Sequence, residues 1–232
     1  MTTEREQSLP TEPEASGTPA GPPSRVRKLI GGAVLAVIAI AAVAFLVNWS
    51  QEREYVFHGG VFTPPAAAAP LDLADQNGEP FSLDQVKGDV ALVYFGYTTC
   101  PDVCPTTLTD FQAVKEGLGA EADRVKFVMV TIDPERDTAA KLKEYLGFFD
   151  SGIIGLRGDA AQTEEVSRDY GITVKRVEYP ESATKYLLDH TALVYLIDPE
   201  GRLLLTFPYG TDPALIAQDV LHVLAAEPGR AA

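Results

Sequence analysis

The chain has few of the residues on which small scaffolds and nucleic-acid-binding proteins depend. Its 232 residues include two cysteines, three histidines and one tryptophan, and 19 Lys and Arg residues stand against 33 Asp and Glu residues. Two cysteines separated by three residues cannot build a disulfide scaffold, so a role specific to this pair is the better interpretation. The formal net charge of -14 argues against a nucleic-acid partner, which would require a clustered basic face. The sequence contains no internal repeat.

The first 24 residues lack large apolar side chains almost entirely and are rich in Pro, Glu, Ser, Thr and Gly. Such a segment cannot bury enough surface to order itself, so residues 1–24 are predicted to be a disordered tail. Apart from Arg5, the charged residues of the tail are glutamates. This composition is unlike an Arg-rich, acid-poor mitochondrial transit peptide, and it favours a bacterial source.

Residues 29–47 contain no charged or strongly polar side chain. As a helix this run would span about 28 Å, close to the hydrocarbon thickness of a bilayer, about 30 Å. Basic residues at positions 25, 27 and 28 precede it, so the positive-inside rule places the tail in the cytoplasm. We therefore expect a single-pass anchor over residues 25–49 in a bacterial cell membrane, with the C-terminal domain outside the cytoplasm.

A cleaved signal peptide is the competing interpretation of the apolar run, because Ala42-Val43-Ala44 supplies a small-residue cleavage pattern. The run is long for a signal peptide, and cleavage there would leave Phe45-Leu46-Val47 as an apolar stub, so length favours the anchor. No cysteine follows directly after the run, which excludes a lipid-modified N-terminus. Residues 50–69, with Pro64-Pro65 and an alanine run, are typical of a semi-rigid linker.

Residues 70–228 alternate short apolar runs with segments of helical spacing, which predicts a three-layer α/β/α domain with a mixed sheet. A hairpin is expected around the Asn77-Gly78 turn within residues 71–83. Further strands are predicted over residues 90–95, 125–132, 153–157, 173–178, 185–188, 191–197 and 203–207. Helices are predicted after the cysteines, from Thr138 to about Phe149, over residues 161–170, and from Asp212-Pro213 onward.

Cys100 and Cys104 lie where the predicted buried strand 90–95 is followed by a helix. Pro101 and Pro105 disfavour the α region for the residues before them, which places the pair in the loop and first helical turn. Unpaired N–H groups at a helix start stabilise a thiolate, lowering a cysteine pKa from about 8.5 to roughly 3.5–7.5. Both thiols are expected to be exposed; the alternative is two buried thiols that act as small hydrophobic groups.

Three separated motifs carry a family resemblance over residues 70–226. They are residues 94–105 (YFGYTTCPDVCP), residues 130–138 (VTIDPERDT), and Asp189-His190-Thr191 followed by residues 195–201 (YLIDPEG). With these motifs in this order, the domain resembles the Sco/SenC proteins, thioredoxin-fold copper chaperones of cytochrome c oxidase assembly. The resemblance implies a thioredoxin-like fold and a copper site, Cu(I) or Cu(II), formed by Cys100, Cys104 and His190. It also implies three partners: an upstream copper donor, a thiol reductant and the oxidase subunit that carries the binuclear copper site.

The residue types agree with copper independently of the family, since thiolates select Cu(I) and a Cys and His combination also tolerates Cu(II). A structural zinc site would need a fourth protein ligand, and neither His58 nor His222 is convincing. His190 is predicted at the start of the strand that follows a loop, and by itself it would be interpreted as an ordinary core histidine. Asp189 either holds the imidazole tautomer or ends a turn.

The other acidic residues near these motifs have structural interpretations. Asp102 either caps the helix or tunes the thiolates, and Asp133 and Asp137 are predicted to mark a strand exit and a helix cap.

The function expected is that of a metallochaperone rather than an enzyme. With three residues between them, Cys100 and Cys104 can close a disulfide, which would remove both sulfur ligands at once. Outside the cytoplasm thiols drift toward disulfides, so a reductant is implied. The alternative is a thiol-disulfide oxidoreductase in which Cys100 attacks and Cys104 resolves, although such reductases usually have two residues between their cysteines. A peroxidase of the same superfamily is a weaker third interpretation.

Overall fold

The computed structural model describes residues 37–45 and 55–226 of the chain. The chain divides into two compact units, Met1–Tyr55 and Val56–Ala232. In the first unit, residues 37–45 are helical. The predicted tail and the remainder of the predicted anchor, residues 25–36 and 46–49, lie outside the described residues. In the part of the chain that is described, no helix is long and apolar enough to cross a membrane.

The second unit contains every strand and helix that the sequence predicts for residues 70–226. The strands are β1 (Gly60–Ala67), β2 (Leu73–Asp75), β3 (Pro80–Phe81), β4 (Val90–Gly96), β5 (Val125–Thr131), β6 (Ile154–Arg157), β7 (Val174–Tyr179), β8 (Lys185–His190), β9 (Leu193–Ile197) and β10 (Arg202–Pro208). The α-helices are α2 (Val103–Leu118), α3 (Ala139–Gly147), α4 (Ala160–Asp169) and α5 (Pro213–Ala225), and short 3-10 helices cover Leu83–Val86 and Gly119–Arg124.

Eight strands form one mixed sheet in the order β1-β10-β9-β4-β5-β6-β2-β3. The central strand β4 is parallel to β5 and antiparallel to β9. It is buried along its whole length because it lies between two strands and has helices over both faces. Helices α2, α3 and α5 lie on one side of the sheet, where α2 packs on α5 and Gln112 of α2 donates to the carbonyl oxygen of Phe149 after α3. Helix α4 lies on the other side, where the ring of Tyr170 at its end packs on Phe95 of β4. The expected three-layer domain with a mixed sheet is therefore confirmed.

The structure differs from the sequence prediction at the linker. Part of the stretch assigned to it, Gly60–Ala67, is strand β1, which pairs antiparallel with β10 at one edge of the sheet. An edge strand tolerates Pro64 and Pro65, because its outer side forms no backbone hydrogen bonds to a neighbouring strand. Just before β1, the backbone N–H and the ring of His58 bond the fully buried Asp219 of α5. The folded unit therefore begins well before residue 70.

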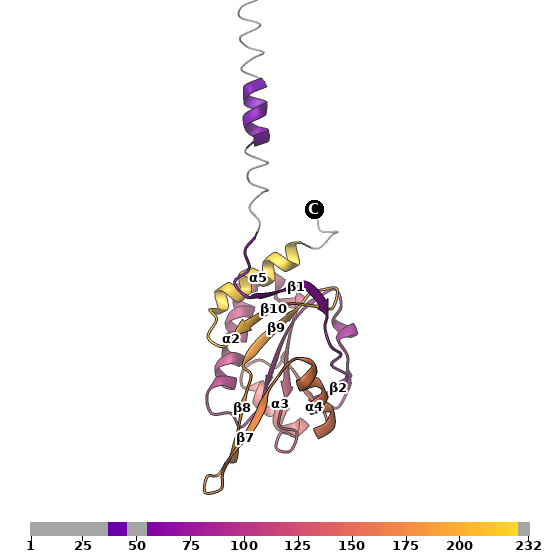
Figure 1. Cartoon of the computed structure of the whole chain (residues 1–232), viewed down its shortest axis with the longest axis vertical. Helices are drawn as coiled ribbons and strands as arrows, with labels where there is room; N and C mark the ends of the chain where they lie inside the picture. Colours follow the sequence, from indigo (N-terminus) through magenta and orange to yellow (C-terminus); the bar gives the residue numbers. More distant parts are fainter. Residues whose placement is uncertain (1–36, 46–54, 227–232) are drawn as a thin grey trace, which may run out of the picture. The chain divides into compact units, whose positions relative to one another are not determined.

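The predicted strands 173–178 and 185–188 form the β7–β8 hairpin, which projects from the body of the domain (Figure 1). Within residues 55–226, these two strands pair only with each other, as a separate two-stranded sheet. β7 is almost wholly exposed, whereas β8 buries Tyr186 and Leu188. Because no backbone ladder joins it to the large sheet, the position of this hairpin depends on side-chain contacts.

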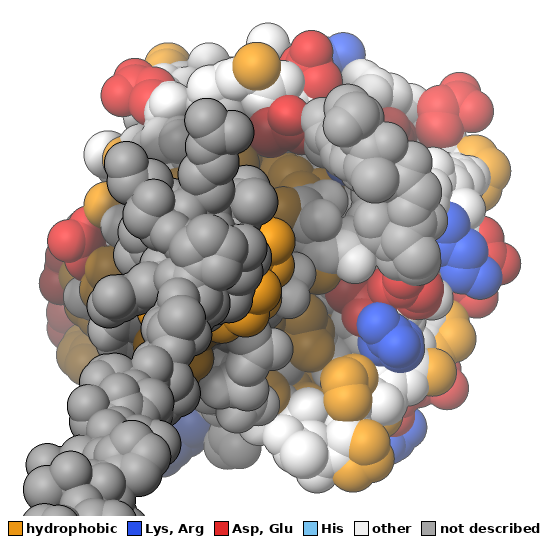
Figure 2. Space-filling view, turned by 90° about the horizontal axis from the view of Figure 1, so that it is seen from above, with side chains coloured by type: hydrophobic (Ala, Val, Ile, Leu, Met, Phe, Trp, Pro, Cys, Tyr) orange, Lys and Arg blue, Asp and Glu red, His pale blue; other side chains and the backbone are white. Residues whose placement is uncertain are grey.

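Charge is spread over the face of the described domain that Figure 2 shows. On the face that Figure 2 shows, Asp and Glu side chains stand at several separate places, and the Lys and Arg side chains do not gather into one patch. The described residues of this face therefore form no basic stripe that could follow a phosphate backbone. This agrees with the formal net charge of -14 for the whole chain.

Candidate metal centre

The two cysteines occupy different environments at the junction of β4 and α2. Cys100 lies in the loop and is half-buried, whereas Cys104 is the second residue of α2 and is 0% exposed. Both thiols are free. Their predicted placement in the loop and first helical turn is confirmed, but the expected exposure is wrong for Cys104. The helix directs that side chain toward β4, where the Tyr94 hydroxyl donates to its Sγ at 3.3 Å.

Gly96 makes the close packing of this sulfur possible. A Cβ at this position would stand 2.6 Å from Cε1 of Tyr94 and 3.0 Å from Sγ of Cys104. Both neighbours are buried, so neither can move aside without disturbing the core. The residue that ends β4 therefore helps to fix the position of Cys104.

His190 lies close to Cys104 although 86 positions separate the two residues. The histidine is the last residue of β8, so its predicted place at the start of the following strand is wrong. Its Nε2 lies 3.8 Å from Sγ of Cys104, and its Nδ1 lies 2.9 Å from the Thr191 carbonyl oxygen. A carbonyl only accepts, so Nδ1 carries the proton and Nε2 presents its lone pair to the sulfur.

The tautomer is thus set by a backbone carbonyl rather than by Asp189, which is exposed. Such a bond on the second ring nitrogen is common in histidines that bind metals. Tyr94 and Tyr97 flank the imidazole, with ring centroids 6.2 and 6.0 Å away. Sequence reasoning missed both tyrosines as site residues, although they lie in the same motif as the cysteines.

The two thiols differ in acidity. The Cys104 thiol donates to the Cys100 thiolate and, with the backbone N–H groups of Asp102 and Cys104, lowers the pKa of Cys100 to about 5 against the opposing effect of burial. The pKa of Cys104 is raised, because it keeps the proton that it donates to Cys100 and because it is buried. The predicted thiolate at the helix start therefore belongs to Cys100, and Cys104 remains a thiol at neutral pH.

A buried carboxylate holds the loop in front of Cys100. Asp137 is fully buried and accepts from the Thr98 backbone N–H at 3.0 Å, from the Thr98 hydroxyl, and from the Thr131 hydroxyl at 2.6 Å. It is not the helix cap that the sequence suggested, because Thr138 caps α3. Asp102 does occupy the N-cap position of α2, but its side chain makes no capping bond. Asp137 therefore ties the cysteine loop to β5.

The site opens to the surface through a cavity of about 280 Å³ beside Cys100. Its lining comes from the cysteine loop and the end of the β7–β8 hairpin. The residues are Tyr97, Cys100, Pro101, Asp102, Val103, Leu187, Leu188, Asp189, His190 and Ala192. A metal ion or a sulfur ligand of another protein could reach Cys100 by this route, whereas Cys104 lies deeper.

The three predicted ligands lie near one another but are not arranged as a complete metal-binding site. Among the described residues, no group of three or more His, Cys, Asp and Glu side chains is spaced as a ready-made metal cluster. Sγ of Cys104 and Nε2 of His190 lie 3.8 Å apart. Cys100 turns its sulfur toward the backbone N–H of Cys104, at 3.5 Å. Two sulfurs and an imidazole form a soft donor set that fits copper.

Comparison with known proteins gives one consistent family. The SCO1/SenC family model matches residues 63–225. A SCO2-like protein of Rickettsia conorii is 41% identical over 143 residues, which cover 62% of this chain and 70% of that protein. A mitochondrial SCO2 homolog of Mus musculus is 33% identical over 199 residues, covering 84% of this chain and 76% of its own length.

Solved structures agree with this match. The copper-bound ScoI of Bradyrhizobium japonicum is 40% identical to this chain, with a TM-score of 0.63. The match covers 68% of this chain and 100% of the ScoI chain. Yeast Sco1 with copper bound is 27% identical, with a TM-score of 0.64, covering 72% of this chain and 92% of that chain. The motifs, the thioredoxin-like mixed α/β fold and these comparisons agree: the chain belongs to the SCO1/SenC family.

Proposed function

We propose that this protein is a copper carrier for cytochrome c oxidase assembly. It binds one copper ion through Cys100, Cys104 and His190 and passes the ion to the binuclear copper site of an oxidase subunit. The proposal rests on one observation: Nε2 of His190 lies close to Sγ of Cys104 and directs its lone pair toward it. Family membership and the copper in two solved relatives support it.

The asymmetry of the thiols suits stepwise loading. Cys100, with a pKa of about 5, is a thiolate at neutral pH and lies beside the cavity, so it makes the first bond to an incoming ion. Cys104 gives up its proton as the ion binds, because a thiolate rather than a thiol ligates metal. The imidazole completes the set. Since two thiolates select Cu(I) and the imidazole extends the range to Cu(II), the site accepts either state.

Copper titration of the reduced chain tests the proposal. His190→Ala should abolish tight Cu(II) binding and leave a titratable dithiol, and Cys100→Ser/Cys104→Ser should take up no Cu(I). His222→Ala on α5 is a matched control, because that residue lies outside the proposed ligand set. Unchanged Cu(II) affinity in His190→Ala would remove the histidine from the site. Equal Cu(I) uptake by the double variant would contradict the carrier function itself.

Thiol-disulfide exchange is a second candidate function, and the unequal pKa values of the two cysteines favour it. The Cys100 thiolate would attack a disulfide of the target, forming a mixed disulfide and releasing one target thiolate. Cys104, after losing its proton, would attack Cys100, forming their disulfide and releasing the second thiolate. In a reductase assay, Cys100→Ser should be inactive and His190→Ala active. Equal loss in both variants would contradict this second function.

We also propose that residues 25–49 anchor the chain in a bacterial cell membrane, with the N-terminus in the cytoplasm. The support is the uncharged run 29–47 and the basic residues that precede it. An extracytoplasmic domain would need a thiol reductant before each round of copper loading. Protease added to intact spheroplasts should degrade the copper-binding domain. Protection of the domain until the cells are lysed would contradict this orientation.

A further inference from the structure

Arg136 connects the hairpin that carries His190 to the body of the domain. It lies in the turn between β5 and α3, and its Nε donates to Oδ2 of the buried Asp133 at 2.5 Å. Its Nη1 donates to the carbonyl oxygens of Thr184 and Tyr186, each at 2.8 Å. One guanidinium thus joins the end of a central strand to the backbone of β8.

The ring of Tyr186 is clamped at the same place. The guanidinium carbon of Arg136 lies 3.5 Å from the ring centroid, and that of Arg176 on β7 lies 3.6 Å from it. Two guanidinium groups so close to one centroid must occupy opposite faces of the ring. The Tyr186 hydroxyl also donates to Oδ1 of Asp133 at 2.8 Å. Cation–π contacts of this kind strengthen when they are shielded from water.

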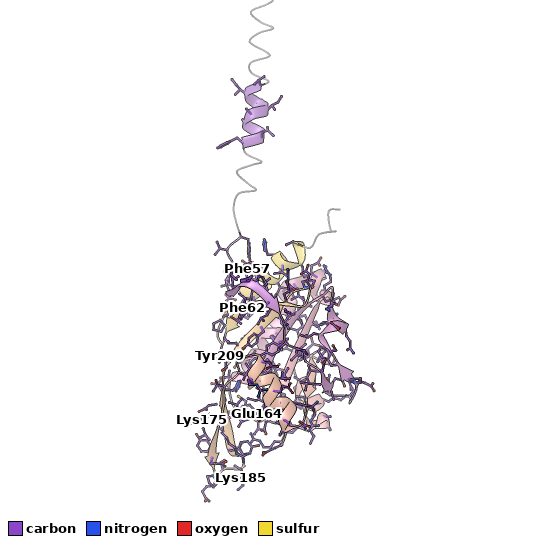
Figure 3. The ribbon with its side chains drawn as sticks, turned by 45° about the vertical axis from the view of Figure 1, so that its right-hand side comes forward. Phe57, Phe62, Glu164, Lys175, Lys185 and Tyr209 are labelled. Carbon is purple, nitrogen blue, oxygen red and sulfur yellow. The ribbon has the colours of Figure 1, made fainter. Side chains whose placement is uncertain are left out.

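Besides Tyr186, β8 buries Leu188 in the core, whereas β7 is almost wholly exposed. A cavity of about 720 Å³ lies between α4 and the hairpin, and Lys185, near the tip, projects away from the body (Figure 3). One further bond, from the Leu188 backbone N–H to the Tyr97 hydroxyl at 3.1 Å, fixes the part nearest His190. The position of the imidazole therefore depends on a few named contacts rather than on a sheet ladder.

We infer that Arg136 is a positioning residue for the copper site. By holding the carbonyl groups of Thr184 and Tyr186, it sets how closely Nε2 of His190 approaches Cys104. This inference rests on the proposed function. The cysteines belong to the β4–α2 junction and meet the hairpin at the bond between Leu188 and Tyr97, whereas the imidazole is carried by the hairpin itself. Loss of the two carbonyl bonds that Arg136 makes to β8 should therefore weaken Cu(II) binding, which uses the imidazole, far more than Cu(I) binding by the two thiolates.

Two matched substitutions separate positioning from general support of the fold. Arg136→Lys keeps a cation beside the buried Asp133, but an ammonium lacks the planar group that bonds Asp133 through Nε and the two carbonyl groups through Nη1 while it stacks on the ring. Arg176→Lys alters the opposite face of the same ring. The ion pairs that Arg176 makes with Glu135 and Glu178 are exposed, and such pairs contribute little.

The test measures Cu(I) and Cu(II) affinities of the full-length reduced chain by competition with chelators, together with its unfolding midpoint. Residues that orient a metal ligand typically change affinity by about 10–100-fold. We expect Arg136→Lys to lower Cu(II) affinity by about that factor and to leave Cu(I) affinity close to that of the unchanged protein. Arg176→Lys should change neither. The NMR signals of the His190 ring should shift in Arg136→Lys alone.

Each contrary result has its own meaning. If the unchanged protein binds neither copper ion, the proposed function fails. If it binds both and Arg136→Lys retains its Cu(II) affinity, the inference about Arg136 fails while the proposed function stands. If the two affinities fall equally along with the unfolding midpoint, Arg136 only supports the fold, and the positioning role is again overturned.

Discussion

Replacing Cys104 should change the acidity of Cys100. The pKa of Cys100 is about 5, and the first cause is the hydrogen bond from the Cys104 thiol. Cys104→Ala removes this donor, while the burial that raises the pKa remains. A hydrogen bond to a charged group contributes about 1.5–3 kcal/mol, which corresponds to about 1–2 pH units. The pKa of Cys100 should therefore rise to about 6–7.

The rate of reaction at neutral pH is not a measure of the pKa of Cys100. Relative to a free thiol with a pKa of about 8.5, a pKa of about 5 raises the thiolate fraction at pH 7 roughly thirtyfold. A Brønsted coefficient of about 0.4–0.5 lowers the reactivity of each thiolate by a similar factor. The two effects nearly cancel. The midpoint of the pH profile, rather than the rate at one pH, is the quantity that the structure predicts.

The assay is alkylation of the reduced chain with iodoacetamide from about pH 4 to about pH 10. This range brackets the pKa of Cys100 both in the unchanged protein and in Cys104→Ala. Modification of Cys100 is quantified by mass spectrometry. Because the folded-state pKa is depressed, reactivity should be full above about pH 6 and lost as the pH falls through about 5. Cys104→Ser is the control: its hydroxyl can still donate, so its midpoint should stay closer to 5 than that of Cys104→Ala.

Two results would refute this reasoning. If the midpoint stays at about 5 in Cys104→Ala, the helix N-terminus and not the second thiol stabilises the thiolate. If Cys100 of the unchanged protein titrates like an ordinary cysteine, its pKa is not depressed by Cys104. The stepwise copper loading proposed above then loses its basis.

Two further predictions concern the support of the cysteine loop. Gly96→Ala should lower the free energy of unfolding by about 1–3 kcal/mol, because the added methyl group overpacks a buried site. Urea titration measures this loss. Gly147→Ala, where a Cβ meets nothing within 4 Å, is the control. Equal urea midpoints for Gly96→Ala and Gly147→Ala would show that the core relaxes around the added methyl group. Asp137→Asn should cost about 1–3 kcal/mol, since it disturbs a buried network that accepts from Thr98 and Thr131. That loss should lower the calorimetric melting temperature by about 2–4 °C per kcal/mol, and an unchanged temperature would show that Asp137 does not hold the loop.

Much of the architecture could be predicted from local sequence. The run 90–95 predicted a buried strand, and β4 is buried from Val90 to Gly96, because a strand covered on both faces needs apolar residues throughout. The Asn77-Gly78 turn and the Asp212-Pro213 helix start were likewise found where local chemistry requires them. The motifs also indicated the family, which the comparisons confirm. The ligand set of Cys100, Cys104 and His190 stays a prediction.

Only the tertiary structure decided which of these residues meet. Cys104 is buried against Tyr94 of β4, and the Thr98 backbone and side chain are held by Asp137, 39 positions later. Strand β1 was missed because alanines and prolines in an edge strand have no distinctive period; what makes that segment a strand is its pairing with β10. The two strands of the β7–β8 hairpin were predicted, but their separation from the large sheet and the contacts of Arg136 with β8 were not, because both depend on residues far apart in the sequence. Local sequence specifies backbone preference, whereas long-range contacts specify which thiol is buried and where the imidazole lies.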